Sequence, residues 1–358
     1  MSGPVHVFVG TKAEYIKTAP LMRLLAERGV DYRLIDSGQH AAFGPGLRAR
    51  LEVKEPDVLL ADRGDVSTIP AAIGWALRIA GLVLSSRRRV RRRLFGGLGG
   101  TCVVHGDTPT TLLATLLARR GGLRVAHLES GLRSHRLTHP FPEELIRILV
   151  MRRAHLLFAP DATAAANLER MGVKGEIVRL PANTVVDAIE FAGAHAGDSD
   201  LVVATMHRVE NLQRRERVEG WVRLLEKVAA DHPVEFAVHE PTRLTLEKSG
   251  LDARLRAAGV VLTDLQPYAE FITKVARAPF VLTDGGSIQE ESAFLGVPCL
   301  LWRDRSERDD GLGENVVLSR YDDAVVDRFL ADPEAHRRER KGIGVSPSVV
   351  ALSALLGD

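Results

Sequence analysis

The sequence of 358 residues has few cysteines, a net charge close to zero and no long apolar run, and each shortage excludes a class of protein. Cys102 and Cys299 are its only cysteines, and both lie in apolar runs, so we expect buried thiols rather than a disulfide framework. The net charge of +2 provides no overall field for nucleic acid. No apolar run approaches the roughly 20 residues of a membrane span. Met1 to Pro4 lead directly into a strand, without the pattern of a secretion signal. We therefore expect a cytoplasmic globular protein.

What the sequence does contain is an alternation of short apolar strands and helical runs, in two successive halves. Short apolar strands are predicted over 5–9 and 32–36. The clearest unit starts with an apolar strand over 101–104, turns at His105-Gly106-Asp107-Thr108 and continues into a helical run over 111–117. This alternation is typical of parallel sheets covered by helices, so we predict an α/β fold in two successive halves. We predict the linker between the two halves within residues 185–200. The tail from Ala331 is expected to be helical and basic, with a last short helix over 346–356.

Small polar groups follow many of the predicted strands. Because the carboxyl ends of parallel strands meet at one edge of a sheet, we expect the loops of the two halves to face each other across one cleft. Acids and a histidine in one site supply general acid and base groups, and glycine turns that enter helices suit an anion. Together these features predict a nucleotide-linked substrate. The loops are Gly10-Thr11-Lys12, Gly38-Gln39-His40, His105-Gly106-Asp107, Glu129, His207-Arg208 and Asp284-Gly285-Gly286-Ser287.

Two further patterns concern metals and charge. The sequence has no HExxH or CxxC motif and no paired histidines at ligand spacing among these loops, so we expect neither a metal nor a cofactor. A helix predicted over about 69–85 leads to the segment Arg87 to Arg93. This segment has six arginines in seven positions, which would surround a helix rather than form one clean basic stripe. It is interpreted either as a solvated helix end or as a contact with a membrane surface or an acidic partner.

Six stretches of the sequence resemble the UDP-N-acetylglucosamine 2-epimerase family and occur in the family's order. The resemblance covers the chain from about residue 5 to residue 325. The stretches are 10–17 (GTKAEYIK), 105–108 (HGDT), 127–133 (HLESGLR), 142–144 (PEE), 207–208 (HR) and 284–291 (DGGSIQEE). The resemblance implies the GT-B architecture, in which two Rossmann-like domains face each other across a cleft and a carboxyl-terminal helix returns to the first domain. The implied domains are residues 1–188 plus about 340–358, which carry the catalytic carboxylates, and residues 189–339, which bind UDP. The resemblance also implies a homodimer.

The resemblance further implies an enzyme that interconverts UDP-N-acetylglucosamine and UDP-N-acetylmannosamine. UDP is eliminated, a glycal forms, and UDP adds back after reprotonation on the other face. The implied catalytic residues are Asp107, Glu129, Glu143 and His207, the last beside the diphosphate. The implied substrate-binding residues are Lys12, Lys17, Arg133, Arg208, Phe271 against uracil, Gly285, Gly286 and Ser287 at phosphate, and Glu291 on the ribose.

Three departures from the family pattern leave alternatives open. Lys12 and Ala13 replace the usual arginine and proline, and lysine lacks the bidentate fork for phosphate. The usual Asp-Ser-Gly-Gly is reordered at 284–287, and Ala41 and Ala42 follow His40, where the family often has polar residues that help to bind an activating UDP-sugar. The alternatives are a related UDP-sugar, a hydrolysing epimerase that releases UDP and free N-acetylmannosamine, a GT-B glycosyltransferase and a non-catalytic UDP-sugar-binding protein.

Overall fold

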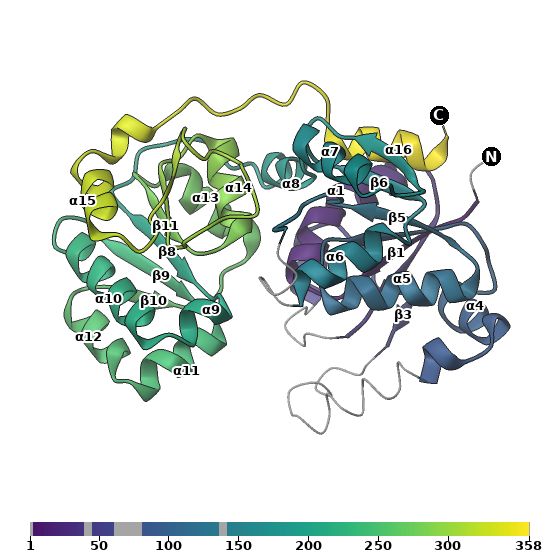
Figure 1. The fold of residues 1–358 in the computed structure, drawn as a ribbon, viewed down its shortest axis with the longest axis horizontal. Helices are drawn as coiled ribbons and strands as arrows, with labels where there is room; N and C mark the ends of the chain where they lie inside the picture. The colour runs from purple at the N-terminus through teal and green to yellow at the C-terminus, as the bar shows by residue number, and fades with distance from the viewer. Residues whose placement is uncertain (1–2, 39–44, 61–80, 136–141, 358) are drawn as a thin grey trace. The chain divides into compact units, whose positions relative to one another are not determined.

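The computed structural model describes residues 3–38, 45–60, 81–135 and 142–357, and the chain forms two compact units (Figure 1). Unit 1 comprises residues 1–188 and 343–358, and unit 2 comprises residues 189–342. Each unit contains one parallel β-sheet with its own hydrophobic core. The α/β fold with two parallel sheets agrees with the sequence prediction.

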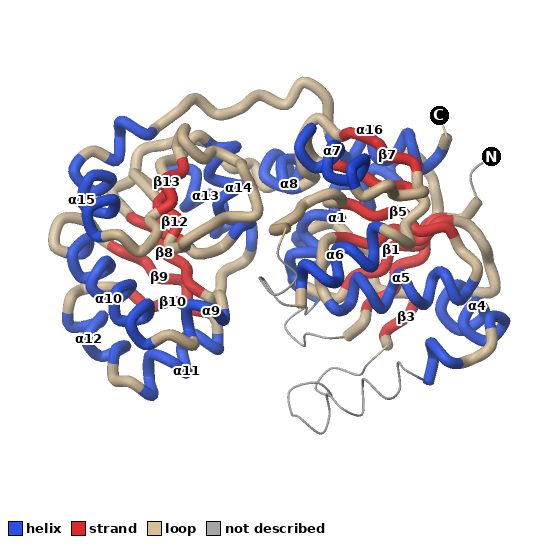
Figure 2. The backbone as a smooth tube through the Cα atoms, in the orientation of Figure 1, coloured by secondary structure: helices blue, strands red, loops and turns tan. Residues whose placement is uncertain are grey.

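Unit 1 contains a seven-stranded sheet in the order β3-β2-β1-β4-β5-β6-β7 (Figure 2). Its central strands are short runs of apolar and β-branched residues that are buried on both faces, as parallel sheets covered by helices require. The strands are β1 (Val5–Val9), β2 (Tyr32–Asp36), β3 (Val58–Leu59), β4 (Thr101–His105), β5 (Arg124–Leu128), β6 (Leu156–Ala159) and β7 (Glu176–Arg179).

Two helices of unit 1 are capped by threonines from the loops that follow β1 and β4. Thr11 caps α1 and Thr108 caps α5, and each hydroxyl accepts a hydrogen bond from the third residue of its helix. The helices are α1 (Lys12–Glu27), α2 (Pro45–Arg50), α4 (Arg87–Phe95), α5 (Pro109–Gly121), α6 (Glu143–Met151), α7 (Ala162–Arg170), α8 (Val185–Phe191) and α16 (Pro347–Leu356). The chain passes from unit 1 to unit 2 within α8, and α16 packs against α1.

Unit 2 contains a six-stranded parallel sheet in the order β10-β9-β8-β11-β12-β13, around a core with Trp221, Phe236 and Phe280. Its strands are β8 (Val202–Met206), β9 (Val234–Val238), β10 (Val261–Thr263), β11 (Val281–Thr283), β12 (Cys299–Leu301) and β13 (Val316–Leu318). Its helices are α9 (Val209–Leu212), α10 (Arg215–Ala229), α11 (Glu240–Lys248), α12 (Leu251–Ala257), α13 (Tyr268–Arg277), α14 (Gly286–Leu295), α15 (Asp323–Ala331) and a 3-10 turn, Pro333–His336.

The structure corrects two local predictions. The tail after Ala331 is not continuously helical: residues 337–345 are irregular, because the backbone N–H groups of Arg338 and Lys341 bond to the carbonyls of Gly296 and Phe294 instead. The arginine run is not the end of a preceding helix but a separate helix, α4, which Ser86 caps.

Three other observations complete the fold. Both cysteines are buried and free, as expected. Within the described residues, no helix has the length and apolar character needed to cross a membrane. Most of the helix predicted over 69–85 lies outside the described residues, as does the segment 39–42 that concerns an activating UDP-sugar.

Candidate functional site

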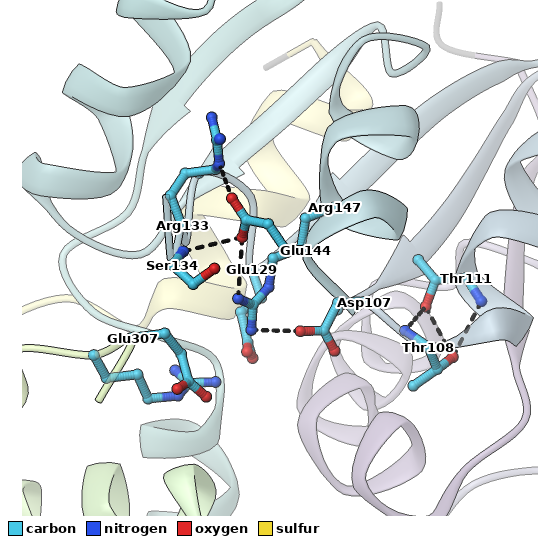
Figure 3. Close-up of polar contacts among 12 residues, drawn as sticks. Asp107, Thr108, Thr111, Glu129, Arg133, Ser134, Glu144, Arg147 and Glu307 are labelled. Atoms are coloured by element: carbon cyan, nitrogen blue, oxygen red, sulfur yellow. Dashed lines mark hydrogen bonds and ion pairs between the residues drawn. The ribbon is translucent and has the colours of Figure 1, made fainter. Parts of the chain in front are cut away.

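In unit 1, Asp107 lies in the loop after β4 and forms an ion pair with Arg147 (Figure 3). Arg147 Nη2 lies 2.5 Å from Asp107 Oδ2, and the arginine side chain is 7% exposed whereas the carboxylate is 26% exposed. Sequence reasoning missed Arg147. It follows Glu143 by four residues on α6, a spacing that places two side chains on the same helix face and that could have indicated it.

The second predicted acid, Glu129, follows β5 directly and has a strained backbone. Its φ of +61° lies in the left-handed region, which a residue with a side chain rarely adopts unless its surroundings hold it there. Its Oε2 lies 2.7 Å from Lys17 Nζ, 2.9 Å from Asn183 Nδ2 and 3.3 Å from His105 Nε2. The strain and the three partners fix the carboxylate at the carboxyl edge of the sheet. Asn183 and His105 were not among the predicted site residues.

Buried His127 connects the two loops that carry Asp107 and Glu129. Its Nε2 lies 2.7 Å from the carbonyl oxygen of Gly106, and its Nδ1 lies 2.7 Å from Ser130 Oγ. Burial lowers the pKa of His127 to about 4, so the ring is neutral at physiological pH. The two nitrogens therefore serve one donor and one acceptor role, which holds both loops in register.

The first glycine turn differs from its prediction as an anion site. The N–H groups of Gly10 and Thr11 donate to Glu14 Oε2 over 2.6 and 3.1 Å, so a carboxylate of the protein itself occupies this helix N-terminus. The hydroxyl of Thr108 donates to the other oxygen of Glu14 over 2.5 Å. Glu14 therefore binds the first loop to the loop that holds Asp107. Burial raises its pKa to about 7, against the opposing effect of these hydrogen bonds.

Of the predicted cations of unit 1, two form ion pairs with carboxylates. Lys17 is buried against Glu129, as described above, and Arg133 Nε lies 2.5 Å from Glu144 Oε1. Glu144 also accepts the backbone N–H of Ser134 over 3.0 Å, which holds the loop after Glu129 against α6 (Figure 3). Lys12, the first residue of α1, is half-buried.

Glu143 is the first residue of α6 and is half-buried. Its Oε2 is buried and accepts no hydrogen bond from any described residue. Burial of a carboxylate oxygen without a hydrogen bond lowers the stability of the fold. Glu143 therefore does not contribute to stability through this oxygen. Glu143 is thus the third carboxylate at this end of unit 1, and its oxygen without a hydrogen bond is able to accept a proton or a hydrogen bond from a ligand.

In unit 2, the predicted phosphate loop begins α14. Gly285 occupies the N-cap position and supplies no side chain to bond the first N–H groups of the helix. Such N–H groups, together with the helix dipole, favour an anion. Fully buried Asp284 holds the adjacent loop in place, since it accepts the backbone N–H groups of His207 and Arg208, each over 3.0 Å.

Two guanidinium groups lie over Gly286. A Cβ on this glycine would lie 3.2 Å from Arg308 Nε and 3.5 Å from Arg208 Nη2. Arg208 pairs with Glu307 over 2.7 Å, and Arg308 pairs with Glu290 over 3.2 Å, so both side chains are held in position. Arg308 was not predicted. It lies in the segment between β12 and β13. Helix N-terminus and guanidiniums together suit phosphate.

His207 turns one edge of its ring inward and exposes the other. Nδ1 is buried and lies 3.6 Å from Asp284 Oδ1, while 39% of the side chain is exposed. Burial of the inner edge lowers the pKa of His207, and the charge of Asp284 opposes this. The ring also lies against His239, with centroids 4.6 Å apart. A largely neutral imidazole with an exposed edge can accept a proton or donate a hydrogen bond through its N–H.

The remaining predicted residues of unit 2 lie on two helices that pack together, α13 and α14. Phe271 is half-buried on α13, and Ser287 is half-buried in the first turn of α14. Glu291, further along α14, is 3% exposed and lies beside buried Tyr268. Burial, and next the charge of Glu291, raise the pKa of Tyr268 well above its ordinary value. Across all described residues, no three histidine, cysteine, aspartate or glutamate side chains gather where they could hold a metal ion.

Comparison with known proteins agrees with this arrangement. A family profile described as UDP-N-acetylglucosamine 2-epimerase matches residues 22–341. The chain belongs to this family. It is therefore a UDP-sugar 2-epimerase, an isomerase, with a GT-B-like fold. The UDP-N-acetylglucosamine 2-epimerase of Methanocaldococcus jannaschii is 29% identical over 335 residues, which are 88% of each chain. That of Yersinia pestis is 30% identical over 366 residues, covering 92% of this chain and 91% of the relative.

Solved structures of UDP-GlcNAc 2-epimerases share the fold. The Methanocaldococcus jannaschii enzyme in complex with UDP-GlcNAc and UDP superposes with a TM-score of 0.79 at 25% identity, over 99% of each chain. The Neisseria meningitidis enzyme bound to UDP-GlcNAc superposes with a TM-score of 0.81 at 23% identity, also over 99% of each chain. The similarity to the Neisseria meningitidis enzyme is a similarity of fold.

Proposed function

We propose that this UDP-sugar 2-epimerase interconverts UDP-N-acetylglucosamine and UDP-N-acetylmannosamine without net hydrolysis. The observation that carries the proposal is the placement of Asp107 and Glu129 after adjacent strands of unit 1, each held by its own cation. Relatives named for the same substrate support the choice of sugar. The departures at Lys12 and at 285–287 are the reason that the sugar needs a direct test.

In the proposed reaction, a carboxylate removes the proton from carbon 2 of the sugar. The electron pair of that C–H bond forms the double bond between carbons 1 and 2, and the bond from carbon 1 to oxygen breaks, so that UDP leaves with its electrons. The return step delivers a proton to the opposite face of carbon 2, and UDP adds to carbon 1. Two acid–base groups in different protonation states are required.

The acids of unit 1 have different surroundings, as two groups with different protonation states require. Glu129 is 7% exposed among Lys17, Asn183 and His105, whereas Asp107 is 26% exposed and has Arg147 as its partner. Glu143 supplies a third carboxyl group. In unit 2, we propose that the first N–H groups of α14 and the guanidiniums of Arg208 and Arg308 stabilise the diphosphate as it leaves. In the same proposal Phe271 lies against uracil, Glu291 binds the ribose, and His207 lies beside the diphosphate, where a ring N–H donates a hydrogen bond to the departing UDP.

Incubation with UDP-N-acetylglucosamine in deuterated water tests the proposal. We expect NMR to show deuterium at carbon 2 and formation of UDP-N-acetylmannosamine. Asp107→Asn, Glu129→Gln and Glu143→Gln should each reduce turnover by about two orders of magnitude or more, as for the loss of a general acid or base. Glu176→Gln, at an exposed position at the start of β7, is the matched control and should keep full turnover. Full turnover in all three site variants would refute the assignment.

A second candidate substrate comes from one relative. The UDP-2,3-diacetamido-2,3-dideoxy-D-glucuronate 2-epimerase of Pseudomonas aeruginosa is 27% identical over 340 residues, which are 90% of each chain. A panel containing this UDP-sugar and UDP-N-acetylglucosamine, followed by NMR without any acceptor, identifies the preferred sugar. Accumulation of free UDP and free N-acetylmannosamine in that assay would instead indicate hydrolysis.

A further inference from the structure

The arginine-rich helix α4 of unit 1 has one buried face and one cationic face. Val90, Leu94 and Phe95 are fully buried in the core of unit 1. Arg88, Arg89, Arg92 and Arg93 are all exposed, and they occupy neighbouring positions on the opposite side of the helix. The tertiary structure thus sorts a run that the sequence alone places all around a helix into one continuous basic surface.

Within the described residues, the charge of α4 is not balanced by acidic side chains. Among the residues that the structure describes, no carboxylate forms an ion pair with any arginine of α4. Three arginines occupy the first turn, where the helix dipole disfavours cations, and no acid is present there. Arg88 and Arg92, like Arg89 and Arg93, are like charges four residues apart, which weakens a helix. The charge opposes local stability, and an anionic partner would offset that cost.

The basic surface extends from α4 to the end of α5. The two helices pack side by side (Figure 1), and exposed Arg119 and Arg120 occupy the last turn of α5. Arg120 Nε donates to the carbonyl of Ser85 over 2.9 Å, immediately before α4. We call this surface the arginine patch; it comprises Arg87, Arg88, Arg89, Arg92, Arg93, Arg119 and Arg120.

Two exposed leucines lie at the two ends of α4. Leu84, shortly before the helix, is 82% exposed, and Leu98, shortly after it, is 50% exposed. An acidic polymer without apolar groups would neutralise the arginines but would leave the leucines in water. A bilayer with anionic headgroups satisfies both, because it offers phosphate to the cations and an acyl boundary to the leucines.

We propose that the arginine patch, with Leu84 and Leu98, docks unit 1 on an anionic membrane surface. The topology leaves the unit 1 acids accessible in this position. β4 and β5 start close to the patch, at Thr101 and Arg124, and run toward Asp107 and Glu129 at their opposite ends. The patch therefore lies at the amino-terminal end of these strands and the acids at the carboxyl-terminal end.

Sedimentation of the full chain with vesicles tests the docking. We expect binding to phosphatidylcholine vesicles that contain phosphatidylglycerol and none to pure phosphatidylcholine, with a loss of binding as salt rises. Each arginine at an anionic surface contributes about fivefold in partition, so the variant R88Q/R89Q/R92Q/R93Q should bind several hundredfold more weakly. L84S should weaken binding by about tenfold. The control with the same change in net charge is R214Q/R215Q/R223Q/R256Q, at exposed positions of unit 2, and it should bind as the unaltered chain does.

Three outcomes would overturn the proposal: no binding to phosphatidylglycerol vesicles, equal binding by the R88Q/R89Q/R92Q/R93Q variant, or unchanged vesicle binding by L84S together with tight binding of soluble polyglutamate. The last result would assign the patch to an acidic macromolecule. Circular dichroism and epimerase turnover should be unchanged in R88Q/R89Q/R92Q/R93Q. If that variant fails to fold, the salt dependence and L84S still decide the question.

Discussion

The buried ion pair between Lys17 and Glu129 predicts a large and specific loss of stability when the lysine charge is removed. The two side chains are 4% and 7% exposed, and Nζ lies 2.7 Å from Oε2. Lys17→Met keeps most of the aliphatic volume and removes the ammonium group. Glu129 then remains buried with Asn183 and His105 as its partners.

The expected magnitude follows from these contacts. Removal of one partner of a buried ion pair generally costs about 3–5 kcal/mol, because the other charge stays buried without compensation. Glu129 keeps one amide donor and a nearby imidazole, so we expect the lower end of the range, about 3 kcal/mol. For a domain of this size, that loss lowers Tm by about 6–12 °C.

A double-mutant cycle separates the pair from a general packing effect. The free energy of unfolding is measured by urea titration, with circular dichroism as the signal, for Lys17→Met, Glu129→Gln and the double variant. Glutamine carries no charge, so the double variant should recover part of the loss, with a coupling energy of about 2 kcal/mol. Lys174→Met, at an exposed position of unit 1, is the control and should change stability by less than about 0.5 kcal/mol. Additive single effects would refute the reasoning.

Two further predictions concern Glu14 and Gly286. The native state holds a proton on Glu14 up to its pKa of about 7, whereas the unfolded chain releases it near 4.5, so stability from this group falls as pH rises through that window. Glu14→Gln should remove this fall of about 3 kcal/mol, and parallel pH profiles of unfolding free energy for the two proteins would contradict the assignment. Gly286→Val places a side chain against the guanidiniums of Arg308 and Arg208, and it should weaken UDP binding in calorimetry by about tenfold or more. Gly342→Val, where an added Cβ meets nothing within 4 Å, is its control, and equal affinities would argue against a phosphate site at α14.

Sequence pattern alone determined the fold class and the edge of each sheet at which the predicted site residues lie. The strands predicted over 5–9 and 32–36 have the bounds of β1 and β2, because a buried parallel strand is a continuous apolar run that a polar turn ends. The same rule predicted Asp107 after β4 and Glu129 after β5, since strand ends in a parallel sheet share an edge.

Only the tertiary structure decided which side chains meet. Lys17 pairs with Glu129, a contact that its implied role in substrate binding did not indicate. Arg147 was recognised only through its contact with Asp107, and Arg308 only through its position over Gly286. The basic face of α4 likewise exists because Val90 and Leu94 are buried on the other side. The physical reason is that local periodicity records which positions of an element face the core, whereas the partner of a charge depends on how distant elements pack against each other.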